Sequence, residues 1–171
     1  MTKRSIEKIR VAAKEIFGKT PTDQAIWKSM RHRDITRKIR DFLWRNAHGL
    51  YRLGNFWNHI PGCEDRADCP ICCKKETLAH IVTECDSTER KVAWKLTNEL
   101  WKKRYEEDLS VSEGAILGGG LAYFKKDNGR PDTAKNRLYR ILVTETAHLI
   151  WVLRCERRIA GNNNTDRKSV V

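Results

Sequence analysis

The sequence predicts a mainly α-helical protein, a helical bundle that carries one loop stapled by zinc. Three observations support this fold class. Apolar residues recur at helical spacing, alternating strand patterns are scarce, and four of the six cysteines lie with one histidine in a segment of 17 residues. The 171 residues suffice for a single compact domain whose core needs no disulfide framework.

Four segments make up this expected domain. Residues 1–62 are a basic helical segment, and residues 63–88 are the zinc-binding loop. Residues 89–161 complete the bundle, and the polar residues 162–171 form a disordered tail. No apolar run approaches the roughly 18 residues of a membrane span, so we expect no membrane partner.

Capping residues and helix breakers set the expected helix boundaries. Asp34 is the predicted N-cap of the second helix, and Gly161 is the predicted stop of the last. The glycines at 118–120 predict a loose turn after a short helix. The longer predicted helices, the second and the last included, span Thr2–Phe17, Ile35–Ala47, Leu53–Ile60, Glu89–Tyr105 and Asp132 or Thr133 to Ala160.

Two of these helices have apolar stripes that we expect to face the core. The stripe of the helix over residues 89–105 consists of Val92, Ala93, Leu96 and Leu100. The last helix is long enough to be the central strut, and its stripe consists of Leu138, Ile141, Leu142, Leu149, Val152, Cys155 and Ile159.

The chain has a formal net charge of +12, which is unevenly distributed. Residues 1–62 hold 14 basic and 5 acidic side chains, whereas residues 63–110 hold 9 basic and 11 acidic ones. A surplus of this size predicts a polyanionic partner, RNA or DNA. The cysteine-rich segment lies in the acidic middle of the chain, so it is not the expected phosphate contact.

The cysteine spacing predicts a metal site. Cys69 and Cys72 form a CxxC turn, and His80 and Cys85 can close a tetrahedral set of four donors. Such a closed set leaves no position for water or substrate, so the zinc would be structural. Several alternatives remain open at this point: Cys73 could replace Cys72, His59 and Cys63 could replace His80 or Cys85, or all the cysteines could be free thiols.

These motifs resemble the reverse transcriptase zinc-binding domain, a small domain near the C-terminus of non-LTR retrotransposon polyproteins, fungal ones in particular. The similarity covers roughly residues 27–101. The residues that carry it are Cys69-Pro70-Ile71-Cys72, Glu76-Thr77, His80-Ile81-Val82, Cys85 and Trp94, preceded by Asp41-Phe42-Leu43-Trp44-Arg45, His48-Gly49 and Phe56-Trp57.

The resemblance implies zinc ligation by Cys69, Cys72, His80 and Cys85. It also implies that reverse transcriptase or ribonuclease H domains of the same element are partners. The seven residues before His80 differ from the four of the retroviral nucleocapsid knuckle, so base stacking by this loop is not expected. The carboxylates of the polymerase and ribonuclease H sites have no counterpart in the chain.

A basic face precedes the cysteines and is the expected nucleic-acid contact. At helical spacing, Arg33, Arg37 and Arg40 fall on one face together with Trp44. Guanidiniums can follow a phosphate backbone, and an indole can stack on an exposed base. The alternative is an ordinary solvated helix face with a covered tryptophan.

No catalytic constellation can be assembled from the sequence, so we expect a binding module and not an enzyme. The alternatives are a structural or protein-interaction module that docks on a polymerase or ribonuclease H domain, and a non-functional remnant of an element. No signal-peptide core follows Met1, which predicts an intracellular protein. The sequence does not determine the oligomeric state.

Overall fold

The computed structural model describes the backbone of residues 2–166 and the side chains of residues 2–160, and it confirms a mainly helical fold. Within this range no strand forms, and only two isolated β-bridges pair Asp68 with Lys75 and Lys125 with Pro131. The α-helices are α1 (Thr2–Phe17), α2 (Asp23–Ser29), α3 (Arg37–His48), α4 (Thr88–Tyr105), α5 (Glu113–Leu117) and α6 (Thr133–Asp166). Shorter 3-10 or π turns are η1 (Gly54–His59), η2 (Glu64–Ala67), η3 (His80–Glu84) and η4 (Gly119–Leu121).

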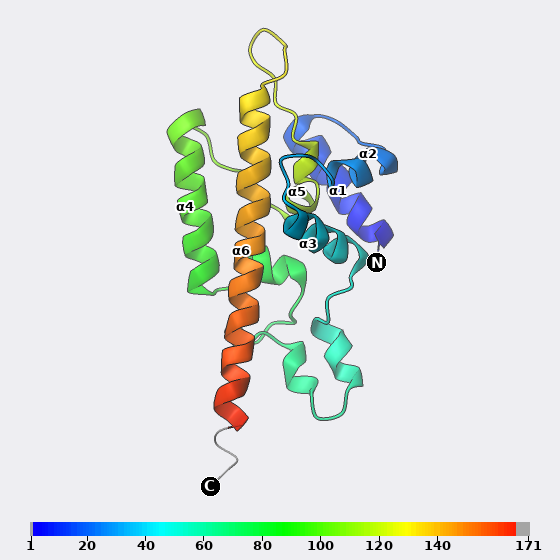
Figure 1. The fold of residues 1–171 in the computed structure, drawn as a ribbon, viewed down its shortest axis with the longest axis vertical. Helices are drawn as coiled ribbons and strands as arrows, with labels where there is room; N and C mark the ends of the chain where they lie inside the picture. Colours follow the sequence, from blue (N-terminus) through cyan, green and yellow to red (C-terminus); the bar gives the residue numbers. More distant parts are fainter. Residues whose placement is uncertain (1, 167–171) are drawn as a thin grey trace.

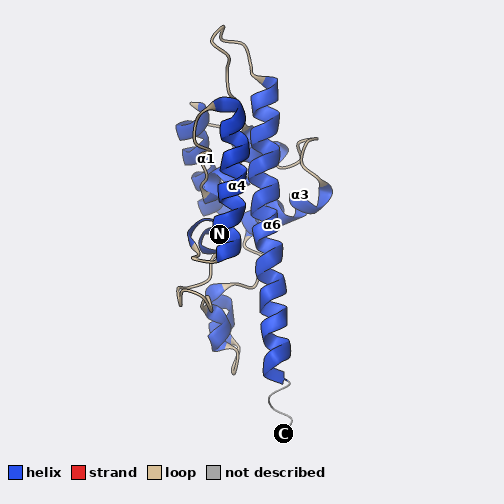
Figure 2. Cartoon of the chain, turned by 90° about the vertical axis from the view of Figure 1, so that its left-hand side faces the viewer, coloured by secondary structure: helices blue, strands red, loops and turns tan. Residues whose placement is uncertain are grey.

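Helix α6 is the central strut of the molecule (Figures 1 and 2). In Figure 1, α4 lies along one side of α6, while α1, α2, α3 and α5 lie on the other side. The C-terminal half of α6 extends past the bundle toward the cysteine-rich loop. No helix within the described residues is both long and apolar enough to cross a membrane.

The core lies where α1, α3 and α5 meet α6. Its fully buried members come from all parts of the chain, and burying each large aliphatic side chain contributes about 1.5–3 kcal/mol. They include Ile9, Ile26, Ile39, Leu43, Ile116, Leu117 and Val143. Three residues of the cysteine-rich loop, Leu78, Ile81 and Val82, join the same cluster. The loop therefore packs on the bundle.

The glycines of α5 and η4 allow close packing, which differs from the loose turn predicted for this segment. A Cβ at Gly114 would lie 2.2 Å from the backbone oxygen of Lys8, and one at Gly120 would lie 2.0 Å from that of Ser29. Only glycine fits at such distances. The short helix α5 is therefore held directly against α1.

The N-cap assignment for the second predicted helix was wrong. Helix α3 begins at Arg37 with Thr36 as its N-cap. The carboxylate of Asp34 instead accepts a hydrogen bond of 2.6 Å from the Arg140 guanidinium on α6. This contact spans more than a hundred residues, so local capping rules could not reveal it. The short helix α2 was also not predicted.

The predicted core stripe of α4 was largely wrong and that of α6 was wrong in part, although Ala93, Leu138 and Leu142 do pack against the core. On α4 the side chains of Val92, Leu96 and Leu100 are exposed, and the helix buries Thr97 and Trp101. On α6, Leu149 and Ile159 are exposed by 49% and 63%. The buried face of α6 carries Tyr139, Val143, Ala147 and Ile150. Tyr139, Val143 and Ile150 directly follow the predicted stripe residues Leu138, Leu142 and Leu149, so the predicted face was displaced from the buried one by one residue.

The predicted C-terminal stop was also wrong. Helix α6 continues through Gly161 to Asp166, so part of the predicted disordered tail is helical. Residues 167–171 of that tail lie outside the described residues.

Candidate metal centre

Two local structures position the four predicted ligands. In the first, the Cys69-to-Cys72 turn is closed by backbone hydrogen bonds of 2.8 Å from Cys69 N–H to Lys74 and 2.9 Å from Cys73 N–H to Cys69. In the second, η3 is one π-helical turn in which Cys85 N–H donates to the His80 carbonyl at 2.7 Å. The wider π turn places His80 and Cys85 on the same side, facing the CxxC turn.

The donor atoms converge on one point. The two buried thiols, Cys69 and Cys85, have their Sγ atoms 3.6 Å apart, and Cys72 Sγ lies 3.1 Å from His80 Nε2. The four donor atoms all lie within 4.8 Å of one another. Three sulfurs and one imidazole nitrogen at these separations can hold one metal ion and staple the loop.

Electrostatics within the cluster differ from one thiol to another. Burial raises the pKa of Cys85 above its ordinary value. At Cys72 desolvation acts in the same direction, but hydrogen bonds from the backbone amide of Asp86 and from the neighbouring thiol of Cys69 outweigh it and lower the pKa. The Nδ1 atom of the buried His80 has no hydrogen-bond partner and lies 4.0 Å from the Glu84 carboxylate.

Three alternative ligands lie outside this cluster. Among the described residues, the group of converging donors contains neither Cys63, Cys73 nor His59. The side chain of Cys73 is exposed and its backbone is left-handed, with φ of +54°. The exposed His59 lies at the end of η1.

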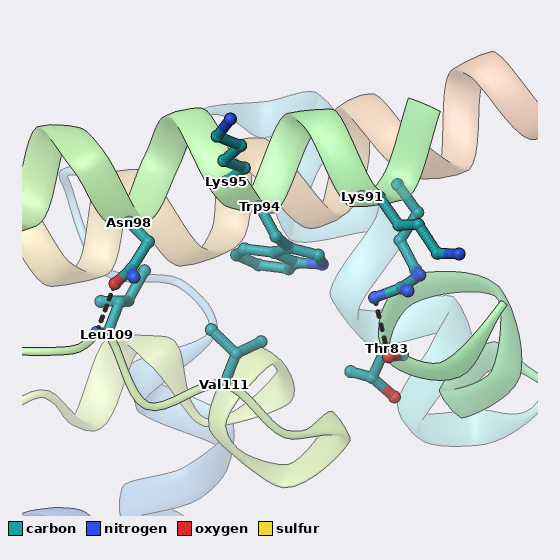
Figure 3. Close-up of a pocket in the computed structure, with 8 residues that line it drawn as sticks. Thr83, Lys91, Trp94, Lys95, Asn98, Leu109 and Val111 are labelled. Carbon is teal, nitrogen blue, oxygen red and sulfur yellow. Dashed lines mark hydrogen bonds between the residues drawn. The ribbon is translucent and has the colours of Figure 1, made fainter. Parts of the chain in front are cut away.

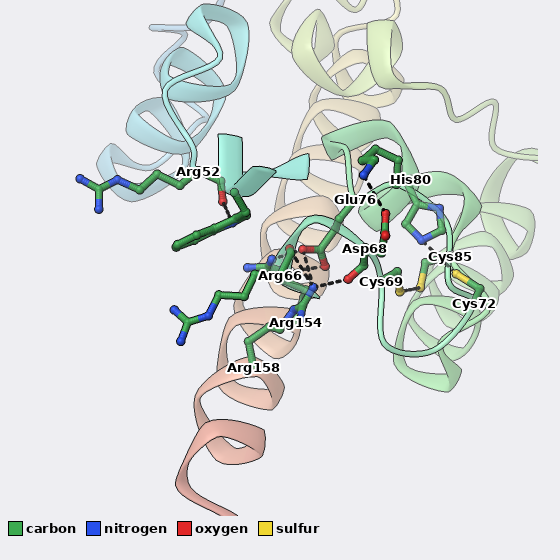
Figure 4. Close-up of polar contacts among 12 residues, drawn as sticks. Arg52, Arg66, Asp68, Cys69, Cys72, Glu76, His80, Cys85, Arg154 and Arg158 are labelled. Carbon is green, nitrogen blue, oxygen red and sulfur yellow. Dashed lines mark hydrogen bonds and ion pairs between the residues drawn. The ribbon is translucent and has the colours of Figure 1, made fainter. Parts of the chain in front are cut away.

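A buried carboxylate fastens the loop to α6 (Figure 4). Glu76 is 1% exposed and accepts a hydrogen bond of 2.9 Å from Arg154 Nε and a second from Arg154 Nη2. Arg158 Nη2 donates to the same carboxylate at 3.1 Å. Sequence reasoning gave Glu76 no such role, because nothing in a single sequence pairs residue 76 with residues 154 and 158.

The start of α4 closes the other side of the loop (Figure 3). Arg90 donates to the carbonyl oxygens of Thr83, at 3.0 Å, and Cys85, and Trp94 Nε1 donates to that of Val82 at 2.6 Å. These bonds satisfy carbonyls at the end of η3, which have no intrahelical partner. A cleft of about 450 Å³ opens between α4 and the segment over residues 109–111.

Of the four residues predicted to contact nucleic acid, three have exposed side chains and the fourth, Arg40, is bound within the fold. Arg33 lies in the turn before α3, so it does not extend the helical ladder, and its side chain is 92% exposed. Arg40 donates to the backbone carbonyls of Ile35 and His32 at 2.8 and 3.0 Å, which gives it a structural role. Arg37 and Trp44 are both exposed on α3.

A cleft of about 290 Å³ lies between α2 and α3. Its walls hold two indoles against one imidazole: the ring of His48 stacks on Trp27 at 5.0 Å and lies 4.5 Å from Trp44. The residues that line it are Trp27, Met30, Arg31, Arg40, Trp44 and His48. Sequence reasoning found Arg40 and Trp44 but missed Trp27 and Arg31, because α2 was not predicted.

Comparisons with known proteins give no relative for this chain. No family model matches it, and neither a curated protein nor a solved structure does. The functional interpretation therefore depends on the residues of this chain alone.

Proposed function

We propose that the chain is a zinc-stapled helical module that binds RNA or DNA mainly through phosphates. Cys69, Cys72, His80 and Cys85 would hold the zinc. Tetrahedral zinc with metal–sulfur bonds of about 2.3 Å places two sulfurs about 3.8 Å apart. The observed separation of 3.6 Å between Cys69 and Cys85 is close to that value. A closed set of four donors makes this zinc structural and gives it no catalytic role.

The observation that carries the nucleic-acid proposal is the cleft between α2 and α3. It places two partly exposed indoles, those of Trp27 and Trp44, beside Arg31. Arg37 lies on α3 about one turn before Arg40, which also lines the cleft. Aromatic rings next to arginines suit a single strand, whose bases stack on the rings while the phosphates pair with the cations. Nearby carboxylates are neutralised: Asp41 pairs with Arg45 at 2.8 Å and Asp34 with Arg140.

A reverse transcriptase zinc-binding domain is the family proposed for this module. The support is the sequence resemblance together with convergence of the four residues that the resemblance assigns as ligands. The proposal makes reverse transcriptase or ribonuclease H domains of the same element natural partners.

A salt titration tests the nucleic-acid proposal. The affinity for a single-stranded oligonucleotide should fall steeply as salt rises, because each neutralised phosphate releases a counterion. Replacing Arg31 and Arg37 together (Arg31→Gln, Arg37→Gln) should reduce the slope of log affinity against log salt by about 1.4. The matched control is Lys103→Gln with Arg104→Gln, two exposed residues of α4 that carry the same charge.

Two results would contradict the proposal. One is a slope near zero for the unmodified protein. The other is an equal reduction of the slope in the cleft variant and in the α4 control, since that would reflect net charge alone. Zinc content should stay the same in both variants, which separates binding from folding.

A second candidate function, protein interaction, is favoured by the exposed apolar residues of α4 and α6. Val92, Leu96 and Leu100 are each about half exposed, as is Leu149 on α6. A 2.8 Å hydrogen bond between Thr97 and Thr146 holds the two helices together beside these residues. Exposed apolar patches often mark protein interfaces. Changing Leu96 and Leu100 to Glu should abolish any self-association seen by light scattering without changing nucleic-acid affinity.

A further inference from the structure

Three arginine side chains line one small cavity next to the metal centre (Figure 4). Arg154 and Arg158 lie one turn apart on α6, and Arg66 lies on η2. Arg52 also lines the cavity, but its guanidinium points away from the other three and lies 5.4 Å from the centre of the Phe56 ring. The cavity measures about 130 Å³ and is lined by Arg52, Trp57, Arg66, Arg154, Arg158 and Ile159. At roughly 30 Å³ per water molecule, this is the space of about four waters. It suits a group the size of phosphate.

The charges around the cavity do not balance. Glu76 is the one carboxylate with a described ion pair to these arginines, and it is already bound by Arg154 and Arg158. Within the described side chains, Arg52 and Arg66 make no ion pair. Glu64 and Asp65 precede Arg66 on η2 but do not line the cavity. One buried carboxylate therefore stands against three guanidiniums, those of Arg66, Arg154 and Arg158.

Two of the arginines, Arg66 and Arg158, are held in place before any ligand arrives. The guanidinium of Arg66 lies 5.3 Å from the centre of the Trp57 ring, and the Trp57 indole donates to the backbone carbonyl of Arg52 at 3.0 Å. Arg158 Nη2 donates to the backbone carbonyl of Asp68 at 2.6 Å. All described bonds of Arg158 use Nη2, so its other two nitrogens remain free to donate.

We propose that this cavity is a phosphate-binding site, in which Arg66 and Arg158 donate to the oxygens of one phosphate group. Guanidiniums match phosphate oxygens through paired N–H donors, and a partly enclosed site strengthens such charged hydrogen bonds. Arg154 has a positioning role, since both of its described donors are used by Glu76. The site is separate from the cleft between α2 and α3 and does not depend on that cleft binding nucleic acid.

Phosphate could reach this site as a free anion or as the end of a nucleic acid, and titrations of the full zinc-loaded chain distinguish the two. The first titrant is inorganic phosphate, followed by calorimetry at low salt. The second is a short single-stranded oligonucleotide with a 5′-phosphate, compared with the same oligonucleotide without it. Tighter binding of the phosphorylated oligonucleotide would identify a nucleic-acid end as the ligand, and equal binding of the two would identify the free anion.

Inorganic phosphate should bind saturably with one site per chain. The double variant Arg66→Gln, Arg158→Gln should weaken its binding by about tenfold for each guanidinium removed. The control Lys103→Gln, Arg104→Gln removes the same charge from α4 and should leave the affinity unchanged. The variant Arg31→Gln, Arg37→Gln should also leave it unchanged, which separates this site from the proposed nucleic-acid cleft.

Two results would overturn the proposal. One is the absence of saturable phosphate binding by the unmodified protein. The other is equal weakening by the Arg66, Arg158 variant and by the α4 control. Zinc content and the thermal midpoint of each variant show whether it is folded, and Arg66→Lys provides a milder second variant that keeps the charge while removing the paired donors.

Discussion

Arg154 of α6 binds the carboxylate of Glu76 with two of its nitrogens, and this contact joins the long C-terminal helix to the loop that carries the metal ligands. Desolvation lowers the pKa of the Arg154 guanidinium, but hydrogen bonding to Glu76 outweighs it and raises the pKa above its ordinary value, so Arg154 stays charged. The contact explains why α6 extends beyond the bundle: its C-terminal half supports the metal centre.

Removing the Glu76 carboxylate should destabilise the fold. The variant Glu76→Ala leaves Arg154 and Arg158 partly buried without their anionic partner, and breaking a buried ion pair from one side costs about 3–5 kcal/mol. We expect the lower end of this range, because the side chains of Arg154 and Arg158 are 13% and 23% exposed. Denaturant unfolding measures the change.

The matched control for this prediction is Glu156→Ala. Glu156 is an exposed residue of α6, the helix that carries Arg154 and Arg158. Its loss should therefore change the free energy of unfolding by no more than about 0.5 kcal/mol. Equal effects of the two substitutions would show that the Glu76 contact contributes nothing specific.

Metal removal should lower stability without unfolding the whole chain. The loop contributes Leu78, Ile81 and Val82 to the core, whereas the contacts among α1, α3, α5 and α6 do not involve the ligands. Treatment with a chelator, or the change Cys85→Ser, should release one zinc per chain and lower the thermal midpoint. Far-ultraviolet circular dichroism should retain most of its helical signal. An unchanged midpoint after complete zinc release would contradict a structural role.

Cys73 should be dispensable for metal binding and unfavourable for stability. Its φ of +54° lies in the left-handed region, which costs a residue with a Cβ about 1–2 kcal/mol. The change Cys73→Gly removes this strain, although part of the gain is offset by the entropy of glycine in the unfolded chain. We expect full zinc content and a stability gain of up to about 1 kcal/mol.

The matched comparison is Cys72→Ser, one residue earlier, which should lose the zinc. Loss of zinc from Cys73→Gly would mean that Cys73, and not Cys72, supplies the fourth ligand. Retention of zinc in both variants would contradict the set of ligands altogether.

The sequence was informative where a signal is local. The period of apolar residues predicted α1 and α4, and the spacing of Cys69, Cys72, His80 and Cys85 predicted which donors converge. It failed where the deciding partner is distant. Glu76 could not be paired with Arg154 from one sequence, and the exposed leucines of α4 match the helical period as well as buried ones do.

The last prediction concerns pH and the half-buried His148 of α6. Its ring lies 5.4 Å from that of Phe42, edge to face, on the core side of α3. Burial lowers the pKa of His148 below its ordinary value of 6.5, Lys38 lowers it further, and Glu145 opposes them. The folded protein therefore favours the neutral imidazole.

The sign of the pH effect follows from this shift. Between the lowered pKa of the folded state and about 6.5, the unfolded chain binds more protons than the folded one, so stability increases with pH. The contribution of His148 is complete above about pH 6.5 and is lost as the pH falls toward the folded-state pKa.

The variant His148→Phe, which keeps an aromatic ring against Phe42, should show a smaller loss of stability on acidification. Denaturant unfolding between pH 7.5 and 5, compared with His59→Phe on the exposed η1, isolates this effect, because protonation of the metal ligands is common to all three proteins. Parallel stability curves for His148→Phe and the unmodified chain would contradict the prediction.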